Sequence, residues 1–529
     1  MHNGRPQGSV TGQSKPLARK QANGSTHRLT ERTLSGLLWM FAGSGCQAIL
    51  QLLVLGILAR LLTPADFGLV TGAMVVIGLS SIVSKLGIGH VVIQQLTLEV
   101  LHLRTAFMLS LLLGAAMSLL IWLAAPGISG LFPIAGLTPI VRTMSLLLLI
   151  QSFSIVAESL LQRELRFRQF AAVEVITYAV GFGVVGVVMA FVGFGAWALV
   201  IAHLSYASLR STGFLIVQPH PKRLSLEKSA SKDLIYFGLG HTAGMMGNFL
   251  AAYGDHFVVG RWLGAEALGL YGRAYQLMAA PTSIFGQVIA TVLFPAMASI
   301  NDRPRRLRVA YRRAVALIAL VMLPASVTLF ILAPEVVHIV LGIGWSDVIV
   351  PFQILVVGIL FRTSSKMSDS IAHATGAVYR RAWRQWLYAA LVIGGAWLGS
   401  SWGVEGVALG VLGALGANFF LMSQLGLRLS NMTWWSFCAA HAPGAALSAI
   451  VGVEVWILSA LLRDWGLSPL QVLGLSVGPA LIAVPILFRY LPRLVLGRDG
   501  LRLLQILMKS LPAQEGRLHR FAQKVYARR

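Results

Sequence analysis

Long apolar segments follow one another along the whole chain, separated by short polar stretches. Most are about 20 residues long, the length of a helix that crosses the roughly 30 Å hydrocarbon core of a bilayer. This pattern predicts an all-α, polytopic integral membrane protein with about fourteen transmembrane helices, at 34–58, 67–88, 105–125, 143–160, 170–191, 195–217, 234–259, 275–297, 314–333, 349–372, 385–400, 402–426, 434–461 and 469–488.

Composition and charge placement agree with this pattern. The 529 residues are 56% hydrophobic and 12% charged, whereas a soluble domain is about 25% charged. When the N-terminus is placed in the cytoplasm and the segments alternate, most of the 43 Lys and Arg residues fall on the cytoplasmic side. We therefore expect both termini in the cytoplasm. The formal net charge of +24 is explained by topology and by anionic lipid headgroups, without a nucleic-acid partner.

Two stretches resemble each other at a fixed offset. Residues 57–69 and 258–274 each place an arginine at the end of an apolar run, Arg60 and Arg261, and a glycine eight residues later, Gly68 and Gly269. The alternative is chance similarity between two helix ends. However, residues 88–92 and 289–293 also match at the same offset of 201 positions, and this second match favours duplication. Six segments separate the copies, so both enter the membrane in the same direction and form a parallel repeat.

The repeat and the polar stretches define an expected organisation. It consists of two parallel six-helix bundles plus two C-terminal helices, flanked by basic cytoplasmic tails. The expected parts are a disordered N-tail 1–33, an N-terminal bundle 34–217, a cytoplasmic linker 218–233, a C-terminal bundle 234–426, transmembrane helices 13 and 14 within 427–490, and a C-tail 491–529.

Ionisable residues inside membrane segments are costly and usually face a cavity or a partner. Four of them lie on one face of the segment 349–372, spaced 4, 3 and 4 residues apart: Arg362, Lys366, Asp369 and His373. A second polar stripe, spaced 7 and 7, follows the segment 234–259: His241, Asn248 and Asp255. We expect a hydrated, partly cationic cavity between these stripes. The alternatives are a local Lys366–Asp369 pair and interhelical hydrogen bonds from His241 and Asn248.

The other buried charges have open roles. Asp255 is expected either to pair with Arg261 or Arg273 or to carry a coupling proton. Arg210 either extends to the cytoplasmic interface or faces the cavity.

Glu158 and Glu174 are more simply explained by ion pairs with a nearby cluster of arginines than by gating. That cluster consists of Arg163, Arg166 and Arg168.

Several classes of chemistry find no support in the sequence. Cys46 and Cys438 lie far apart in apolar segments and indicate neither a metal nor a redox site. GFGVVG at 181–186 matches the dinucleotide pattern, but it lies inside an apolar segment with no preceding strand. The chain has no GxxxxGK[ST], HExxH or paired CxxC motif. We therefore expect no catalytic residues, no cofactor and no metal, and a transporter rather than an enzyme.

Four segments carry a family resemblance: FGAWALV at 194–200, VVGRWLGAEALGLYGRAYQL at 258–277, VLFPAM at 292–297 and WGVEGVA at 402–408. In this order they resemble the bacterial Wzx-type polysaccharide flippases of the multidrug/oligosaccharidyl-lipid/polysaccharide exporter superfamily. The likeness extends over nearly all of residues 30–490. The members of the family that the chain resembles include lipopolysaccharide and exopolysaccharide transporters such as the colanic acid exporter.

The resemblance implies fourteen helices in two lobes, and ion-coupled movement of an undecaprenyl-diphosphate-linked oligosaccharide from the inner to the outer leaflet. Asp255, Arg261 and Arg273 match recurring polar positions of the family, and Arg362 matches an arginine of its tenth-helix motif. Lys85 and Lys366 depart from the family pattern, which leaves the sugar and charge of the substrate open.

The sequence thus predicts a lipid-linked oligosaccharide flippase of the bacterial inner membrane. In this hypothesis Arg362, Lys366, Arg210 and Asn248 line a cationic substrate cavity. Coupling or gating falls to Asp255, Glu174, Glu158, Asp369 and His373, and Arg60, Arg261 and Arg273 mark the helix ends of the repeat.

The alternatives are a lipid II flippase or multidrug exporter of the same superfamily. A membrane-embedded polysaccharide polymerase or ligase is less favoured, because the predicted outer loops are short. Expected partners are membrane lipids and the polymerase and chain-length components of the pathway.

Overall fold

A computed structural model describes residues 43–94, 99–221, 228–288, 297–300 and 303–490. The predicted tails 1–33 and 491–529 lie outside these residues, as do parts of the linker 218–233 and of the eighth apolar segment. The side chain of His241 is likewise not described.

Every regular element in the described residues is a helix. An N-terminal group contains the first described helix, Gly43–Leu61, followed by α2 (Pro64–Lys85), α3 (Ile88–Gln94), α4 (Val100–Gly130), α5 (Leu137–Ser152), α6 (Ile155–Arg163), α7 (Phe167–Tyr178), the π-helix η1 (Ala179–Gly186), α8 (Val187–Phe191) and α9 (Ala196–Val217).

A C-terminal group follows, and two further helices end the described chain. The group contains α10 (Lys228–Trp262), α11 (Gly264–Val288), α13 (Pro304–Ile331), α14 (Ala333–Val340), the 3₁₀ turn η3 (Ile343–Val348), α15 (Ile349–Val357), α16 (Ile359–Ala374), α17 (Val378–Gly399), the turn η4 (Ser400–Trp402) and α18 (Gly403–Ser430). The last two helices are α19 (Trp434–Asp464) and α20 (Pro469–Tyr490).

The prediction of an all-helical membrane protein is confirmed. In the described residues, each predicted apolar segment falls on a helix or on a pair of helices joined at a bend. Nine helices there are long and apolar enough to cross a membrane, or up to eleven if each bent pair is one span. The count of fourteen spans stays a prediction.

Local sequence explains where these helices begin and which faces they expose. Thr63 caps α2, because its hydroxyl accepts from the Asp66 N–H while the Asp66 carboxylate accepts from the Thr63 N–H; Pro64 fits the first turn. Large apolar side chains such as Leu123 (62% exposed) and Phe191 (78%) cover the outside. Such exposure suits hydrocarbon as the solvent.

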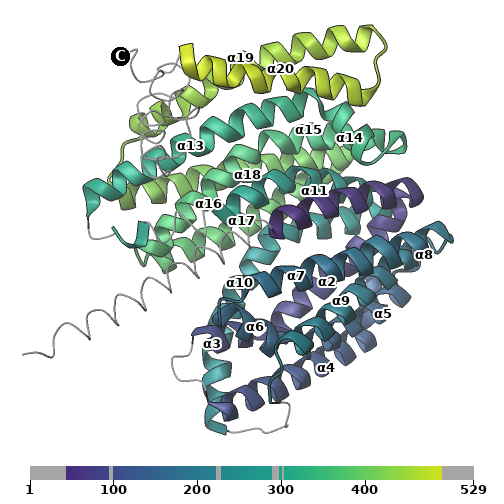
Figure 1. Ribbon diagram of the computed structural model, residues 1–529. Coiled ribbons are helices and arrows are strands. Elements are labelled where there is room, and N and C mark those ends of the chain that lie inside the picture. The colour runs from purple at the N-terminus through teal and green to yellow at the C-terminus, as the bar shows by residue number, and fades with distance from the viewer. Residues whose placement is uncertain (1–42, 95–98, 222–227, 289–296, 301–302, 491–529) are drawn as a thin grey trace, which may run out of the picture.

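Figure 1 shows helices α2 to α9 of the N-terminal group on one side of the molecule and helices α13 to α20, in green and yellow, on the other. Helix α10 packs against both groups, since it contacts α2, α3 and α4 as well as α11 and α17. Helices α19 and α20 pack along α13 and α14 at the far edge. The principal helix-to-helix contact between the groups is the crossing of α2 and α11.

The two repeat glycines, Gly68 and Gly269, lie at this crossing, and each contacts the backbone of the other helix. A Cβ added at Gly68 would lie 1.7 Å from the carbonyl oxygen of Ala265, and one at Gly269 would lie 1.8 Å from that of Pro64. Residues 64 and 265 differ by the same 201 positions as 68 and 269. Each repeat therefore contacts the other through the same pair of positions. Such a matched pair of contacts is expected when the two repeats are related by a two-fold axis.

A second connection joins the groups near the same helix ends. Arg60 closes the first described helix, and its Nη2 donates to the carbonyl oxygen of Ile339 at 2.7 Å, at the end of α14. The indole Nε1 of Trp345 donates to the carbonyl oxygen of Ala59 at 2.8 Å. In both contacts the two residues are about half of the chain apart in sequence. The contacts hold the two groups together at the side predicted to face outward.

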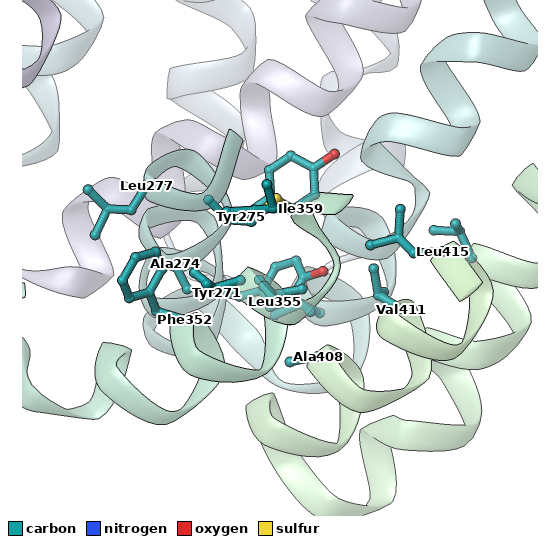
Figure 2. Packing of buried hydrophobic residues seen from close by; sticks show 14 of the residues in the cluster. Tyr271, Ala274, Tyr275, Leu277, Phe352, Leu355, Ile359, Ala408, Val411 and Leu415 are labelled. Atoms are coloured by element: carbon teal, nitrogen blue, oxygen red, sulfur yellow. The ribbon is translucent and has the colours of Figure 1, made fainter. Parts of the chain in front are cut away.

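Helix α11 is also central to the core of the C-terminal group. Figure 2 shows Tyr271 and Tyr275 of α11 among Phe352, Leu355 and Ile359, with Val411 of α18 nearby. Tyr271 is fully buried, and Tyr275 is 9% exposed. Two buried phenol hydroxyls in an apolar core need hydrogen-bond partners, and those partners belong to the polar interior described next.

Candidate functional site

The predicted cationic stripe lines a cavity of about 250 Å³, which we call the α16 cavity. Asn248 of α10 lines the same cavity, so one residue of the second stripe lies beside Arg362, Lys366 and Asp369 of the first. His373 and Asp255 are not among the lining residues. Helices α17 and α18 complete the wall, with Arg381, Tyr388 and Asn418 among the lining residues.

Each cation of the α16 cavity is held by a contact from another helix. The Arg362 guanidinium donates to the Tyr275 hydroxyl at 2.5 Å and lies 4.9 Å from the centre of that ring. Lys366 Nζ donates to the carbonyl oxygen of Thr282 at 3.3 Å. Both partners are on α11, so α11 sets the positions of the charges that α16 carries.

The carboxylate of the stripe has a different partner from the predicted one. Asp369 forms an ion pair with Arg381 of α17, and His373 Nε2 lies 3.9 Å from it. The described residues show no Lys366–Asp369 ion pair within 4 Å, whereas the Asp369–His373 contact joins two members of the stripe. Sequence reasoning missed Arg381 because it lies in a run of basic residues assigned to the cytoplasmic side, and nothing in that run distinguishes it from Arg380 and Arg384.

The α16 cavity thus carries an excess of positive charge. Its lining contains three cations, Arg362, Lys366 and Arg381, and one carboxylate, Asp369. Cations held away from bulk water are stabilised when an anion enters beside them. The cavity therefore suits a negatively charged guest and disfavours a positively charged one.

A buried carboxylate lies next to this cavity but does not pair as predicted. Asp255 is 1% exposed; its Oδ2 accepts from the Tyr271 hydroxyl at 2.6 Å, and His256 Nδ1 lies 2.8 Å from Oδ1. Pairing with Arg261 or Arg273 is wrong. The His256 ring contacts Tyr275 at 5.0 Å, so Asp255 is connected to Arg362 through aromatic groups. His256 was missed because a lone histidine in an apolar run gives no distinctive signal.

A separate charge cluster lies in the N-terminal group. Arg210 of α9 contacts Glu174 of α7 at 2.6 Å and Glu158 of α6 at 3.0 Å. The Tyr206 hydroxyl donates to the other oxygen of Glu174 at 2.6 Å. This arrangement corrects two predictions. The ion-pair partner shown for both glutamates is Arg210, and Arg210 does not line the α16 cavity.

The three repeat-motif arginines do not form one site. Arg60 connects the first described helix with α14, as described above, and Arg261 lies 5.8 Å from the Trp262 ring centre. Arg273 donates to Gln276 Oε1 at 2.6 Å and lies 4.5 Å from the centre of the Phe67 ring. Of the three, Arg273 lines an interior cavity in the described part of the chain, which is a different one from the α16 cavity.

Comparison with known proteins identifies the family. Residues 57–350, more than half of the chain, match the family described as polysaccharide biosynthesis protein. The chain belongs to this family. This assignment confirms the resemblance noted in the sequence.

Two relatives and one solved structure extend the family assignment. The lipopolysaccharide biosynthesis protein WzxC of Escherichia coli (strain K12) is 28% identical over 391 residues, covering 73% of this chain and 78% of its own. The teichuronic acid biosynthesis protein TuaB of Bacillus subtilis (strain 168) is 25% identical over 350 residues, covering 66% and 72%.

The lipid II flippase MurJ in an inward closed conformation superposes with a TM-score of 0.69 at 13% identity, covering 86% of this chain and all of that one. At this identity the likeness concerns the fold. This polysaccharide biosynthesis family member is thus a multi-pass membrane protein whose fold resembles that of this flippase.

Proposed function

We propose that this protein is a secondary-transport flippase for an undecaprenyl-diphosphate-linked oligosaccharide repeat unit. It moves the unit from the inner to the outer leaflet of the bacterial inner membrane by alternating access between the two helix groups. Family membership and the names of WzxC and TuaB support a role in polysaccharide biosynthesis. The polymerase and chain-length components of the pathway would receive the product.

The observation that carries this proposal is the charge of the α16 cavity, with three cations against one carboxylate. A diphosphate is an anion with several acceptor oxygens, which match guanidinium and ammonium donors. The lipid tail stays in the bilayer while the charged headgroup binds the cations. A multidrug exporter of cationic compounds needs the opposite sign of lining charge.

A coupling ion is the second part of the proposal. Asp255 is a buried carboxylate that accepts from the Tyr271 hydroxyl and the His256 backbone N–H, and no Lys or Arg of the described residues lies within ion-pairing distance of it. Such a group can bind a proton without breaking an ion pair to Lys or Arg. We therefore propose Asp255 as the coupling site, and the Arg210 cluster with Glu158 and Glu174 as a structural or gating element of the N-terminal group.

The test compares charge-neutral variants in a strain that lacks the chromosomal gene. Arg362→Gln with Lys366→Gln removes two cavity cations and should reduce export of surface polysaccharide by about tenfold or more, because charge-assisted hydrogen bonds contribute about 1.5–3 kcal/mol each. Arg305→Gln with Arg306→Gln removes two exposed charges from the first turn of α13 and is the matched control. Wild-type export at equal protein level in the cavity variant would contradict the proposal.

Tyr275→Phe separates charge from packing. It removes the hydroxyl that accepts from Arg362 but leaves both cations and the ring. If export depends on the charges, this variant should retain most activity, whereas equal loss in Tyr275→Phe and in the double variant would indicate that the contact between α11 and α16 is what matters.

A further inference from the structure

A second interior cavity, of about 470 Å³, lies between the two helix groups, and we call it the inter-group cavity. Its wall comes from the first described helix, α2, α7, η1 and α9 on one side and from α10 and α11 on the other. Helix α10 separates it from the α16 cavity, since Ala252 lines one cavity and its neighbour Tyr253 lines the other. The two cavities are thus neighbours with different linings.

The N-terminal wall of the inter-group cavity carries a stacked pair of aromatic rings. Tyr178 and Phe182 lie 4.8 Å apart with 19° between their planes. His203 contacts the Phe182 ring edge-to-face at 4.7 Å, and Tyr206 contacts the Tyr178 ring at 5.8 Å. Both members of the pair line the cavity and are partly exposed, so this wall is an extended apolar surface with ring hydroxyls and an imidazole at its edge.

A change of helix type presents this pair. Phe182 lies within the π-helix η1, which begins directly after Tyr178. A Cβ at Gly181 would lie 2.7 Å from Tyr206 Cα, so η1 approaches α9 to a distance that only glycine allows. Short π-helical stretches cost stability and occur often at functional sites. The tight contact fixes the ring pair toward the cavity.

The opposite wall supplies polar donors and acceptors. Arg273 donates from one Nη to Gln276, and its buried Nε has no hydrogen-bond partner in the described part of the chain. No carboxylate in the described ranges lies within ion-pairing distance of this guanidinium. On the N-terminal side, Gln51 of the first described helix adds a further amide.

We propose that the inter-group cavity binds a sugar ring of the transported oligosaccharide, with Tyr178 and Phe182 as the stacking surface. A sugar has an apolar face of C–H groups, which packs on aromatic rings, and a rim of hydroxyls, which pair with amides and guanidinium groups. Aromatic rings facing a few convergent polar groups form such a binding site. This inference rests on the proposed function, because it assigns the glycan to one cavity and the diphosphate to its neighbour.

The test measures binding of two lipids to the full-length protein in detergent. One is undecaprenyl diphosphate, which lacks sugar; the other is the lipid-linked oligosaccharide fraction extracted from the host. We expect Tyr178→Leu and Phe182→Leu each to weaken binding of the glycosylated lipid by about three- to tenfold, the range of one lost stacking contact. Binding of undecaprenyl diphosphate should stay unchanged.

Controls separate this inference from the proposed function. Phe191→Leu changes a mostly exposed aromatic residue of α8 in the same helical run and should leave both affinities unchanged. Wild-type protein that binds both lipids with equal affinity, or ring variants that lose both equally, would overturn the sugar site while leaving the flippase proposal intact. Wild-type protein that binds neither lipid would overturn both.

Discussion

The reciprocal glycine contact between α2 and α11 gives the sharpest structural prediction. Gly68→Ala places a methyl group where the carbonyl oxygen of Ala265 lies 1.7 Å away. Ordinary contact between a carbon and another heavy atom needs about 3.5 Å. The two helix backbones must therefore separate by well over 1 Å, and with them the two groups at the side predicted to face outward.

The size of the effect follows from the cost of overpacking. Inserting a methyl group into a tight contact typically costs about 1–3 kcal/mol. Only the state in which α2 and α11 touch bears this cost, so the ratio of the closed to the separated state should fall by about 5- to 150-fold. Gly269→Ala, with a 1.8 Å approach to the carbonyl oxygen of Pro64, should have the same effect.

Distance measurements on spin-labelled protein can detect this shift. Leu61 (39% exposed) and Ile343 (80% exposed) lie at the ends of the connected helices and accept labels, after Cys46 and Cys438 are replaced by serine. In the wild type we expect a dominant short distance, and in Gly68→Ala a large longer-distance population.

The matched control is Gly413→Ala in α18, where a Cβ meets no atom within 4 Å. It should leave the distances unchanged and stabilise α18 slightly, because alanine favours helix over glycine. An unchanged distance distribution in Gly68→Ala, at wild-type thermal stability, would refute the reasoning.

Three further predictions concern single contacts. Arg210→Met leaves Glu158 and Glu174 without their shared cation and should lower stability by about 2–3 kcal/mol, the range of a lost hydrogen bond to a charged group, with partial recovery in Arg210→Lys. An unchanged unfolding midpoint in detergent would contradict this. Asp255→Asn keeps an acceptor for Tyr271 and should change stability by less than about 1 kcal/mol. It should nevertheless abolish the dependence of export on the proton gradient, and a retained dependence would argue against Asp255 as the coupling site. Trp345→Phe removes the donor to the Ala59 carbonyl oxygen, should cost about 1 kcal/mol and should increase the longer-distance population in the spin-label assay; identical distances would show that the indole hydrogen bond contributes nothing to closure.

The positions of the helices and the residues that share one helix face could be predicted from the sequence, because both depend only on the length of apolar runs and on spacing along one helix. Twenty apolar residues indicate a membrane helix wherever it packs, so the positions of the apolar segments agree with the helices. The 4 and 3 spacing placed Arg362, Lys366 and Asp369 on one face of α16, and the structure places them around one cavity, although His373, four residues further on, is not among the lining residues. The fixed offset of Gly68 and Gly269 corresponds to a reciprocal contact.

Pairing between helices was beyond the reach of spacing arguments. Glu158, Glu174 and Arg210 come from three helices, and their encounter depends on how α6, α7 and α9 pack. Nearby arginines in sequence were therefore the wrong partners to choose. Likewise, the Asp255 hydrogen bonds depend on the placement of Tyr271, one helix later, in a core that periodicity alone does not resolve.

The proposed function is tested most directly by deleting the gene in its own host. Lipid-extracted, diphosphate-linked oligosaccharides and surface polysaccharide are then analysed together. The flippase account predicts accumulation of one repeat-unit lipid with loss of the surface polymer, and restoration of both by the plasmid-borne gene. Normal surface polysaccharide without lipid-linked intermediates, accompanied by new sensitivity to cationic drugs, would contradict it.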